Sequence, residues 1–466
     1  MAIQSVTTKI ISTLGNKESL IPIIAKDAVD SASLTYNAYK AGGTVEGIDR
    51  AFDEFGTQAI WIGGIPFFKK LYDLSAYKLG KLNPDVDIRV LNNKEYASWA
   101  SENAKGFINK KGKTVKDAIT ESLKDGGKKA NNLYKGKVIV ATALTLGTYF
   151  ALTKLKHKNT KNNVLNKLHN DTFKSENSDK TKISHKGSSI YSNLKGVEQN
   201  NNSVFSDINN LNQNNSAQTP SFKGIVKKAV DGILFNPVHN MKIIDAGITT
   251  ERLACSRNPV EFVEHAIKEG AFLFTLYGLG GKIESGIDKL SDKVFNKPIE
   301  LGIDVLMDKN FENALANNKI LSDIAQMPAK NKSLTEKLNF IINNPNNALV
   351  QAAKKSKIVS VVKDAKGNQV IDTSKFINIE EFEALADKLK NIDTKFKGSN
   401  QSIKTYLNKT KAFKVGSVLA NIGISCAILG YGIPKLVYKY REWKTGSSKF
   451  HVAEDIKTKN EGKKIA

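Results

Sequence analysis

The sequence contains little cysteine, which excludes proteins that are held together by several disulfides or by cysteine-bound metal ions. Only two cysteines occur in 466 residues, Cys255 and Cys426, so neither a disulfide framework nor a cysteine-based metal motif is present. A reducing or redox-neutral setting fits this usage best. No secretory signal is visible, because the early apolar run at 20–25 is shorter than a usual signal core. We therefore expect any membrane insertion to use internal segments.

Arginine is also scarce, although the chain as a whole is strongly basic. A net charge of +24 by itself suits an anionic partner such as nucleic acid or an acidic membrane surface. Only five of the 70 basic residues are arginine, however, whereas recognition of phosphate and guanine prefers the planar guanidinium group. We interpret the lysine excess as compositional background, and we do not expect nucleic acid to be the partner.

Constellations of catalytic or metal-binding residues are missing as well. The Gly-Lys-Thr run at 112–114 has the wrong spacing for a phosphate-binding loop. The pair Glu264 and His265 has no second histidine at the spacing of a zinc-binding helix. Neither cysteine has a candidate base nearby in the sequence. We therefore expect no catalytic residue, no metal ligand and no cofactor, and a protein that is not an enzyme.

An internal repeat is the most informative pattern that is present. Residues 45–100 align without a gap on residues 260–315, at a constant offset of 215 residues. The alignment predicts a tandem duplication of one helical unit. Two pairs of acidic residues recur in it, Glu46 with Glu261 and Glu54 with Glu269. We interpret them as charges near helix starts, which complement the helix dipole. The alternative is an undefined polar site beside each apolar segment.

The predicted fold class is mainly α, with two copies of the helical unit that each end in a long apolar helix. The first unit covers 1–156, with apolar helices near 55–68 and 138–153. A stretch rich in Asn, Ser and Lys follows at 157–222. Its apolar residues are isolated and cannot bury enough surface to offset the entropy of ordering, so we predict a disordered linker.

The second predicted unit covers 223–445, and a basic polar tail follows it at 446–466. Its apolar helices lie near 270–281 and 415–434. One β-hairpin is inserted near 357–373, where two β-rich runs flank a turn that contains glycine. The shorter apolar segment of each copy contains several glycines. These segments could enter the bilayer as returning helices or as broken, re-entrant segments.

The two terminal runs have the apolar character of membrane spans. The run 415–434 has 20 residues without a charge, the length that a helix needs to cross about 30 Å of hydrocarbon. The run 138–153 is shorter, although flanking lysines can extend it. Small residues recur on one face of each run, which lets helices approach closely and predicts packing between the runs or between copies of the chain. These residues are Ala143, Gly147 and Ala151 in the first run, and Gly416, Ala420, Gly423, Ala427 and Gly430 in the second.

Together these patterns predict a non-enzymatic integral membrane protein of structural, scaffolding or membrane-organising type. Its expected partners are the lipid bilayer and, through the small-residue faces, further copies of itself. Its expected location is the inner or cytoplasmic membrane of a bacterium, with most soluble parts in the cytoplasm. Two alternatives stay open. One is a soluble or peripheral helical protein that binds anionic membrane or nucleic acid through lysine-rich faces. The other is a transporter-like protein or enzyme with a site between the copies.

Overall fold

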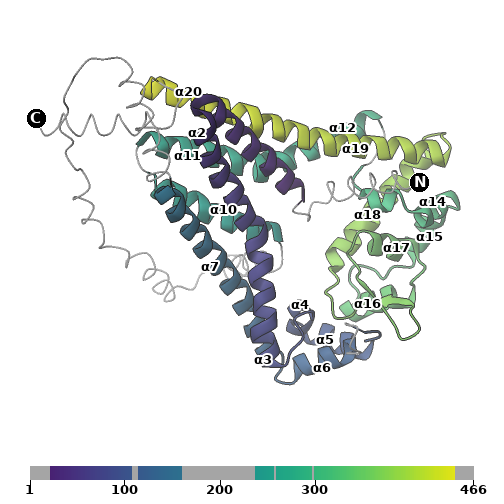
Figure 1. Ribbon diagram of the computed structural model, residues 1–466. Coiled ribbons are helices and arrows are strands. Elements are labelled where there is room, and N and C mark those ends of the chain that lie inside the picture. The colour runs from purple at the N-terminus through teal and green to yellow at the C-terminus, as the bar shows by residue number, and fades with distance from the viewer. Residues whose placement is uncertain (1–20, 108–113, 160–236, 257–258, 296–298, 447–466) are drawn as a thin grey trace, which may run out of the picture. The chain divides into compact units, whose positions relative to one another are not determined.

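The computed structural model describes residues 21–107, 114–159, 237–256, 259–295 and 299–446. Within these residues the protein is mainly helical (Figure 1), and the one sheet among them has two antiparallel strands. The mainly α fold class is thereby confirmed. The described residues other than Asn159 belong to one compact unit, which comprises Met1–Lys158 and Pro237–Ala466. Residues from both predicted copies therefore contribute to the same unit.

Several sequence-based predictions concern residues outside the described ranges. The predicted linker is described only at 157–159, where the structure continues helix α7, and the rest of it lies outside. The predicted tail is described only at Gly446. Of the Gly-Lys-Thr run, only Thr114 is described, and its side chain caps helix α6 by accepting a hydrogen bond from the backbone of Asp117.

Helix α2 spans Ile21–Tyr72 and is divided at Gly43. The backbone of Gly43 has φ 77° and ψ −163°, a combination that glycine adopts far more readily than other residues. Beyond Gly43 the helix continues without a break through the uncharged run 55–68. It then leads into the π-helical turn η1 (Asp73–Tyr77) and α3 (Lys78–Gly80). Gly43 therefore divides α2 into two helical parts.

The glycines of the shorter apolar segments do not break the helices that contain them. A Cβ atom built on Gly64 of α2 would lie 2.8 Å from Cγ2 of Thr145, so glycine here permits close approach of α7. In the second copy α11 (Pro259–Leu273) leads through the π-helical turn η3 (Phe274–Leu279) into α12 (Gly280–Phe295). Neither segment is therefore broken in the structure, because close packing explains the glycine in the first and the helical path is continuous in the second.

The two long apolar runs form the helices in which they were expected. The run 138–153 lies inside α7 (Lys128–Asn159). The run 415–434 lies in α19 (Ile403–Ala427), the π-helical turn η4 (Ile428–Gly432) and the start of α20 (Ile433–Thr445), which follow one another as one long helix (Figure 1). Both helices are long and apolar enough to cross a membrane, by length and composition alone.

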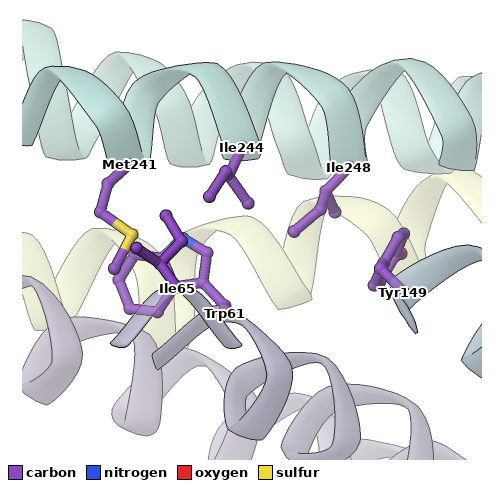
Figure 2. Packing of buried hydrophobic residues seen from close by; sticks show 6 residues of the cluster. All are labelled: Trp61, Ile65, Tyr149, Met241, Ile244 and Ile248. Carbon is purple, nitrogen blue, oxygen red and sulfur yellow. The ribbon is translucent and has the colours of Figure 1, made fainter. Parts of the chain in front are cut away.

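One apolar core lies where α2, α7 and α10 (Pro237–Ala254) meet (Figure 2). On α10 the buried residues recur at spacings of three and four, which places them on one helix face. Burial of such side chains contributes about 1.5–3 kcal/mol each at most, and this core therefore fixes α10 against α2 and α7. The buried residues of this core are Trp61, Ile65, Tyr149, Met241, Ile244 and Ile248.

A second apolar core joins α11 and η3 to η4 and α20. Phe272 and Leu276 come from the first pair of elements and are four residues apart. Leu429, Ile433 and Val437 come from the second pair and also recur every fourth residue, so each helix presents one apolar stripe. This core holds the end of the second long helix against α11 and η3.

Shorter helices precede each of the two long apolar helices. Before α7 they are α4 (Ile88–Asn92), α5 (Lys94–Glu102) and α6 (Val115–Leu123). Before α19 they are α13 (Ile303–Leu306), α14 (Lys309–Ala316), α15 (Lys319–Ala325), α16 (Leu334–Asn343), α17 (Ala348–Lys355) and α18 (Ile379–Lys397). The indole of Trp99 on α5 donates to the side chain of Asn339 on α16 at 2.9 Å. The two groups of short helices are therefore in direct contact.

The predicted hairpin is confirmed, although its strands are shorter than the β-rich runs. Strand β1 (Val361–Lys363) pairs antiparallel with β2 (Gln369–Ile371). The carboxylate of Asp364 accepts hydrogen bonds from the backbone N–H groups of Lys366 and Asn368 at 2.9 and 2.8 Å. Gly367 has φ 81°, so it supplies the left-handed turn position.

Candidate functional site: a buried charge cluster

Charged side chains collect in the interior where α2, α7, α10 and α11 meet. Six of them are each no more than 8% exposed. Charged residues are rarely buried to this degree unless they are paired, so the arrangement of the pairs decides what the cluster can do. We call these six residues the charge cluster: Asp53 and Glu54 of α2, Lys156 of α7, Arg252 of α10, and Lys268 and Glu269 of α11.

One short, buried ion pair joins the two predicted copies. The ammonium group of Lys268 donates to both carboxylate oxygens of Glu54, at 2.6 and 2.8 Å. The guanidinium of Arg50, one turn earlier on α2, lies 2.8 Å from the same carboxylate. Glu54 therefore has two cationic partners, one on its own helix and one on α11.

Arg252 connects α10 to three other helices. Its guanidinium donates to the carboxylate of Glu269 on α11, to the hydroxyl of Tyr149 on α7 at 2.8 Å, and to the hydroxyl of Thr57 on α2 at 3.2 Å. A guanidinium presents five donors in a fixed fork, so one arginine can serve several acceptors in a way that a lysine cannot. This arginine therefore ties four helices together at one point.

The remaining two members of the cluster, Lys156 and Asp53, anchor α7. The ammonium group of Lys156 lies 2.9 Å from a carboxylate oxygen of Asp53 on α2. Lys156 is near the end of a helix whose central run is uncharged, and it turns toward the interior rather than outward. The pair therefore links the end of the first apolar helix to the charge cluster.

A second set of buried charges holds α20 against α11 and α2. Arg441 donates from Nε and Nη2 to the two carboxylate oxygens of Glu264, at 2.7 and 2.6 Å, which is the bidentate geometry of a strong pair. A third guanidinium nitrogen lies 3.8 Å from Glu46. Next to Glu264, the imidazole of His265 lies 3.6 Å from the carboxylate of Glu261, one turn earlier on α11.

The four repeated glutamates are all buried and all take part in these contacts. Glu261 does lie in the first turn of α11, as a helix-start charge would. The others are paired with cations from distant segments. The repeat does not reveal those cations, because Lys268 aligns with Asp53 and Arg252 lies outside the aligned residues 260–315. Only the recurrence of the acidic residues pointed toward a polar site.

The small-residue stripes proposed for helix packing face mainly outward. Ala143, Gly147 and Ala151 are exposed on α7. On the second helix Gly416, Gly423 and Ala427 are exposed, and Ala420 is partly buried. Gly430 is the member with a close contact, because a Cβ atom built there would lie 2.8 Å from Cγ1 of Val29. Within the described residues the two stripes are therefore not packed on each other, and packing between copies of the chain stays a prediction.

The chemistry available at the charge cluster is electrostatic. Removing one partner of a buried ion pair typically costs about 3–5 kcal/mol, because it leaves a buried charge without a partner. Among the described residues no group of three or more His, Cys, Asp or Glu side chains could hold a metal ion. The cluster can therefore fix the helices relative to one another. Comparison of the chain with protein families, curated proteins and solved structures finds no match.

Proposed function

We propose that the protein is a non-enzymatic integral membrane protein of structural, scaffolding or membrane-organising type. In this proposal α7 and the helix formed by α19, η4 and α20 cross the bilayer. The observation that carries it is the low burial of these helices. Of the apolar 18-residue stretch in each helix, only 28% is buried inside the protein. A helix this apolar in the core of a soluble protein is mostly buried, whereas a spanning helix presents its apolar surface to lipid.

The distribution of side chains around α7 supports this proposal. Ile139, Leu144 and Phe150 are exposed. Thr145 and Lys156 are buried. A helix on the surface of a soluble protein shows the opposite arrangement, with apolar residues inside and charges outside. Apolar residues outside and polar or charged residues inside are typical of helices in lipid.

The second helix has the same arrangement. Leu419 and Ile424 are exposed, whereas Lys414 and Arg441 are buried. Near its end the ring of Trp443 is exposed, as expected for an aromatic side chain at the membrane interface. This supports one orientation for both helices, in which the charge cluster and Arg441 lie inside the protein and lipid covers the outside.

The helix bounds support the duplication that forms part of this proposal. Helices α4 and α13 begin at Ile88 and Ile303, which the sequence alignment pairs. Helices α5 and α14 begin at Lys94 and Lys309, which it also pairs. Helices α5 and α14 also have side-chain caps. Asn93 accepts a hydrogen bond from the backbone N–H of Tyr96, and Asp308 accepts one from the backbone N–H of Asn310.

Contacts between the two groups of short helices bear on topology. The backbone N–H of Thr335 at the start of α16 donates to Glu95 of α5 at 2.9 Å, beside the contact of Trp99 with Asn339. Both groups therefore lie on one side of a membrane that the protein crosses. Since each group directly precedes a long apolar helix, both long helices start from that side. The chain must then return across the bilayer between them.

Two further segments can supply the additional membrane crossings. They are α2 after Gly43 and the helix formed by α11, η3 and α12. The first runs beside α7, because Gly64 faces Thr145 and Gly56 faces Leu152 at Cβ distances of 2.8 and 3.2 Å. Each copy then crosses the membrane twice, and we place the lysine-rich short helices in the cytoplasm.

Membrane fractionation of the full chain tests the proposal. The chain should stay with the membrane pellet after washes with alkaline carbonate and with high salt. Release by either wash would instead show a peripheral or soluble protein. As a matched pair, Ile424→Lys places a charge on the exposed face of the second helix and should reduce insertion, at a cost of about 2.5–3.5 kcal/mol. Leu321→Lys on the short helix α15 should leave fractionation unchanged.

A further inference from the structure

A small cavity lies beside the charge cluster, between α2, α10 and α11. Its volume is about 30 Å³, which is room for one or two water molecules. Side chains of both predicted copies line it, among them the aspartates Asp27 and Asp30 of α2 and Asp245 of α10. Upstream of the aligned repeat, Asp27 and Asp245 are each followed by alanine and lie 218 residues apart, close to the repeat offset of 215.

Acidic groups outnumber cations around this cavity. The lining contains the carboxyl groups of Glu54 and Glu269, and these are matched by Lys268 and Arg252. None of the three aspartates forms an ion pair with a described residue. Three carboxyl groups in one buried site are therefore left without a cation, which is costly if all three are ionised.

Asp30 provides an independent observation that the cavity takes a ligand. Asp30 is 2% exposed and lines the cavity, and among the described residues its Oδ1 atom has no hydrogen-bond partner. Asp245, by contrast, accepts a hydrogen bond from the hydroxyl of Tyr277. A buried acceptor without a partner is rare in proteins, and a bound proton would turn this oxygen into a donor toward water in the cavity.

The electrostatic surroundings agree with this geometry. The three aspartates lie on α2 before Gly43 and on α10, outside the segments that we propose to cross the membrane. Burial is the main cause that raises the pKa of each of them to about 7. The charged and titratable groups that face them are Glu54 of α2, Arg252 of α10, Lys268 and Glu269 of α11, and Tyr277 of η3. Among these, Lys268 and Arg252 favour ionisation, and the glutamates oppose it.

We propose that this cavity is a proton-binding site formed by Asp27, Asp30 and Asp245. Each binding step forms one O–H bond on a carboxylate oxygen with a proton taken from water, and no electron is transferred. The site adds proton uptake and release to a protein whose proposed function is structural. It does not depend on whether the helices cross a membrane. In a protein that does cross one, buried acidic residues of this kind mark proton pathways.

Infrared difference spectroscopy of the full chain in detergent tests the site without substitution. Raising the pH from about 5 to about 9 should remove absorption of protonated carboxyl groups, since ordinary aspartates are already ionised at about pH 4. Each of the variants Asp27→Asn, Asp30→Asn and Asp245→Asn should lose about a third of that change. Asp364→Asn in the exposed hairpin turn should lose none of it.

Two results would overturn the proposal. The first is a wild-type spectrum without a protonated carboxyl band above about pH 5, and this result stands even if a variant fails to fold. The second is a titration midpoint that falls when choline chloride is replaced by sodium or potassium chloride. That shift would assign the cavity to an alkali cation in place of protons.

Discussion

Lys268 and Glu54 form a buried ion pair at 2.6 Å, although 214 positions separate them in the sequence. Lys268 lies on α11 and Glu54 on α2, so the pair joins the two predicted copies. The position that aligns with Lys268 in the first copy is Asp53, of the opposite charge. The two predicted copies therefore contribute complementary residues to one cluster rather than two equivalent sites.

Lys268→Met should destabilise the protein by about 3 kcal/mol, because Glu54 and Glu269 would lose a cation in a buried setting. Arg50 would still face Glu54, which limits the loss. Thermal unfolding of the purified chain measures the effect. The matched control is Lys332→Met, since the Lys332 and Glu336 pair is exposed and such pairs contribute at most about 1 kcal/mol. Equal losses in the two variants would contradict a structural role for the buried cluster.

Gly64→Ala should lower the unfolding temperature, because its Cβ atom would lie 2.8 Å from Thr145. Overpacking of this kind costs about 1–3 kcal/mol. Gly423→Leu should leave the unfolding temperature unchanged, since a Cβ atom there meets nothing within 4 Å, but it should weaken association between copies. Unfolding curves and analytical ultracentrifugation separate the two effects. Unchanged association in Gly423→Leu would show that the exposed stripe is not a packing surface.

The sequence was sufficient for the class of fold and for the long elements. Apolar runs located both long helices, and β-rich runs around a Gly-containing turn located the hairpin. It was misleading at Gly64 and Pro66, where breaking residues lie inside a continuous helix. Glycine there permits contact with Thr145, and one proline removes a single backbone hydrogen bond.

The charge cluster could not be found from one sequence. Its cations, such as Lys268 and Arg252, have no basic counterpart in the other copy, so the repeat did not single them out. A buried lysine and an exposed one look the same in a chain with this many lysines. Only the three-dimensional packing of α2, α10 and α11 shows which of them are paired.

Stability should depend on pH through the three cavity aspartates. A pKa raised to about 7 means that the folded state binds more protons than the unfolded state between about pH 4 and pH 7. Stability is therefore present below that range and lost across it, by at most about 1.4 kcal/mol per pH unit for each group. Unfolding curves measured at several pH values give the free energy of unfolding as a function of pH. In Asp30→Asn this free energy should fall less steeply as the pH rises. An unchanged slope would contradict the raised pKa of Asp30.

Limited trypsin digestion should cut first within the predicted linker, 157–222, where lysines are frequent and no core is expected. The two fragments should nevertheless stay together on a sizing column. Contacts such as Lys268 with Glu54 and Arg252 with Tyr149 join residues from both sides of the cut. A single resistant fragment that includes the linker would contradict the predicted organisation, and fragments that separate would contradict the shared charge cluster.

The most direct measurement of the central claim is the membrane side of Ser98 and Asn313. Both are exposed, on α5 and α14, and the alignment of the two copies pairs them. Ser98→Cys and Asn313→Cys are made singly in a background with Cys255→Ser and Cys426→Ser, and intact cells are treated with an impermeant thiol reagent. Our account predicts that both cysteines are protected in intact cells and react equally once the membrane is opened. Labelling of one but not the other would contradict two crossings per copy, and labelling that ignores membrane integrity would contradict the membrane protein itself.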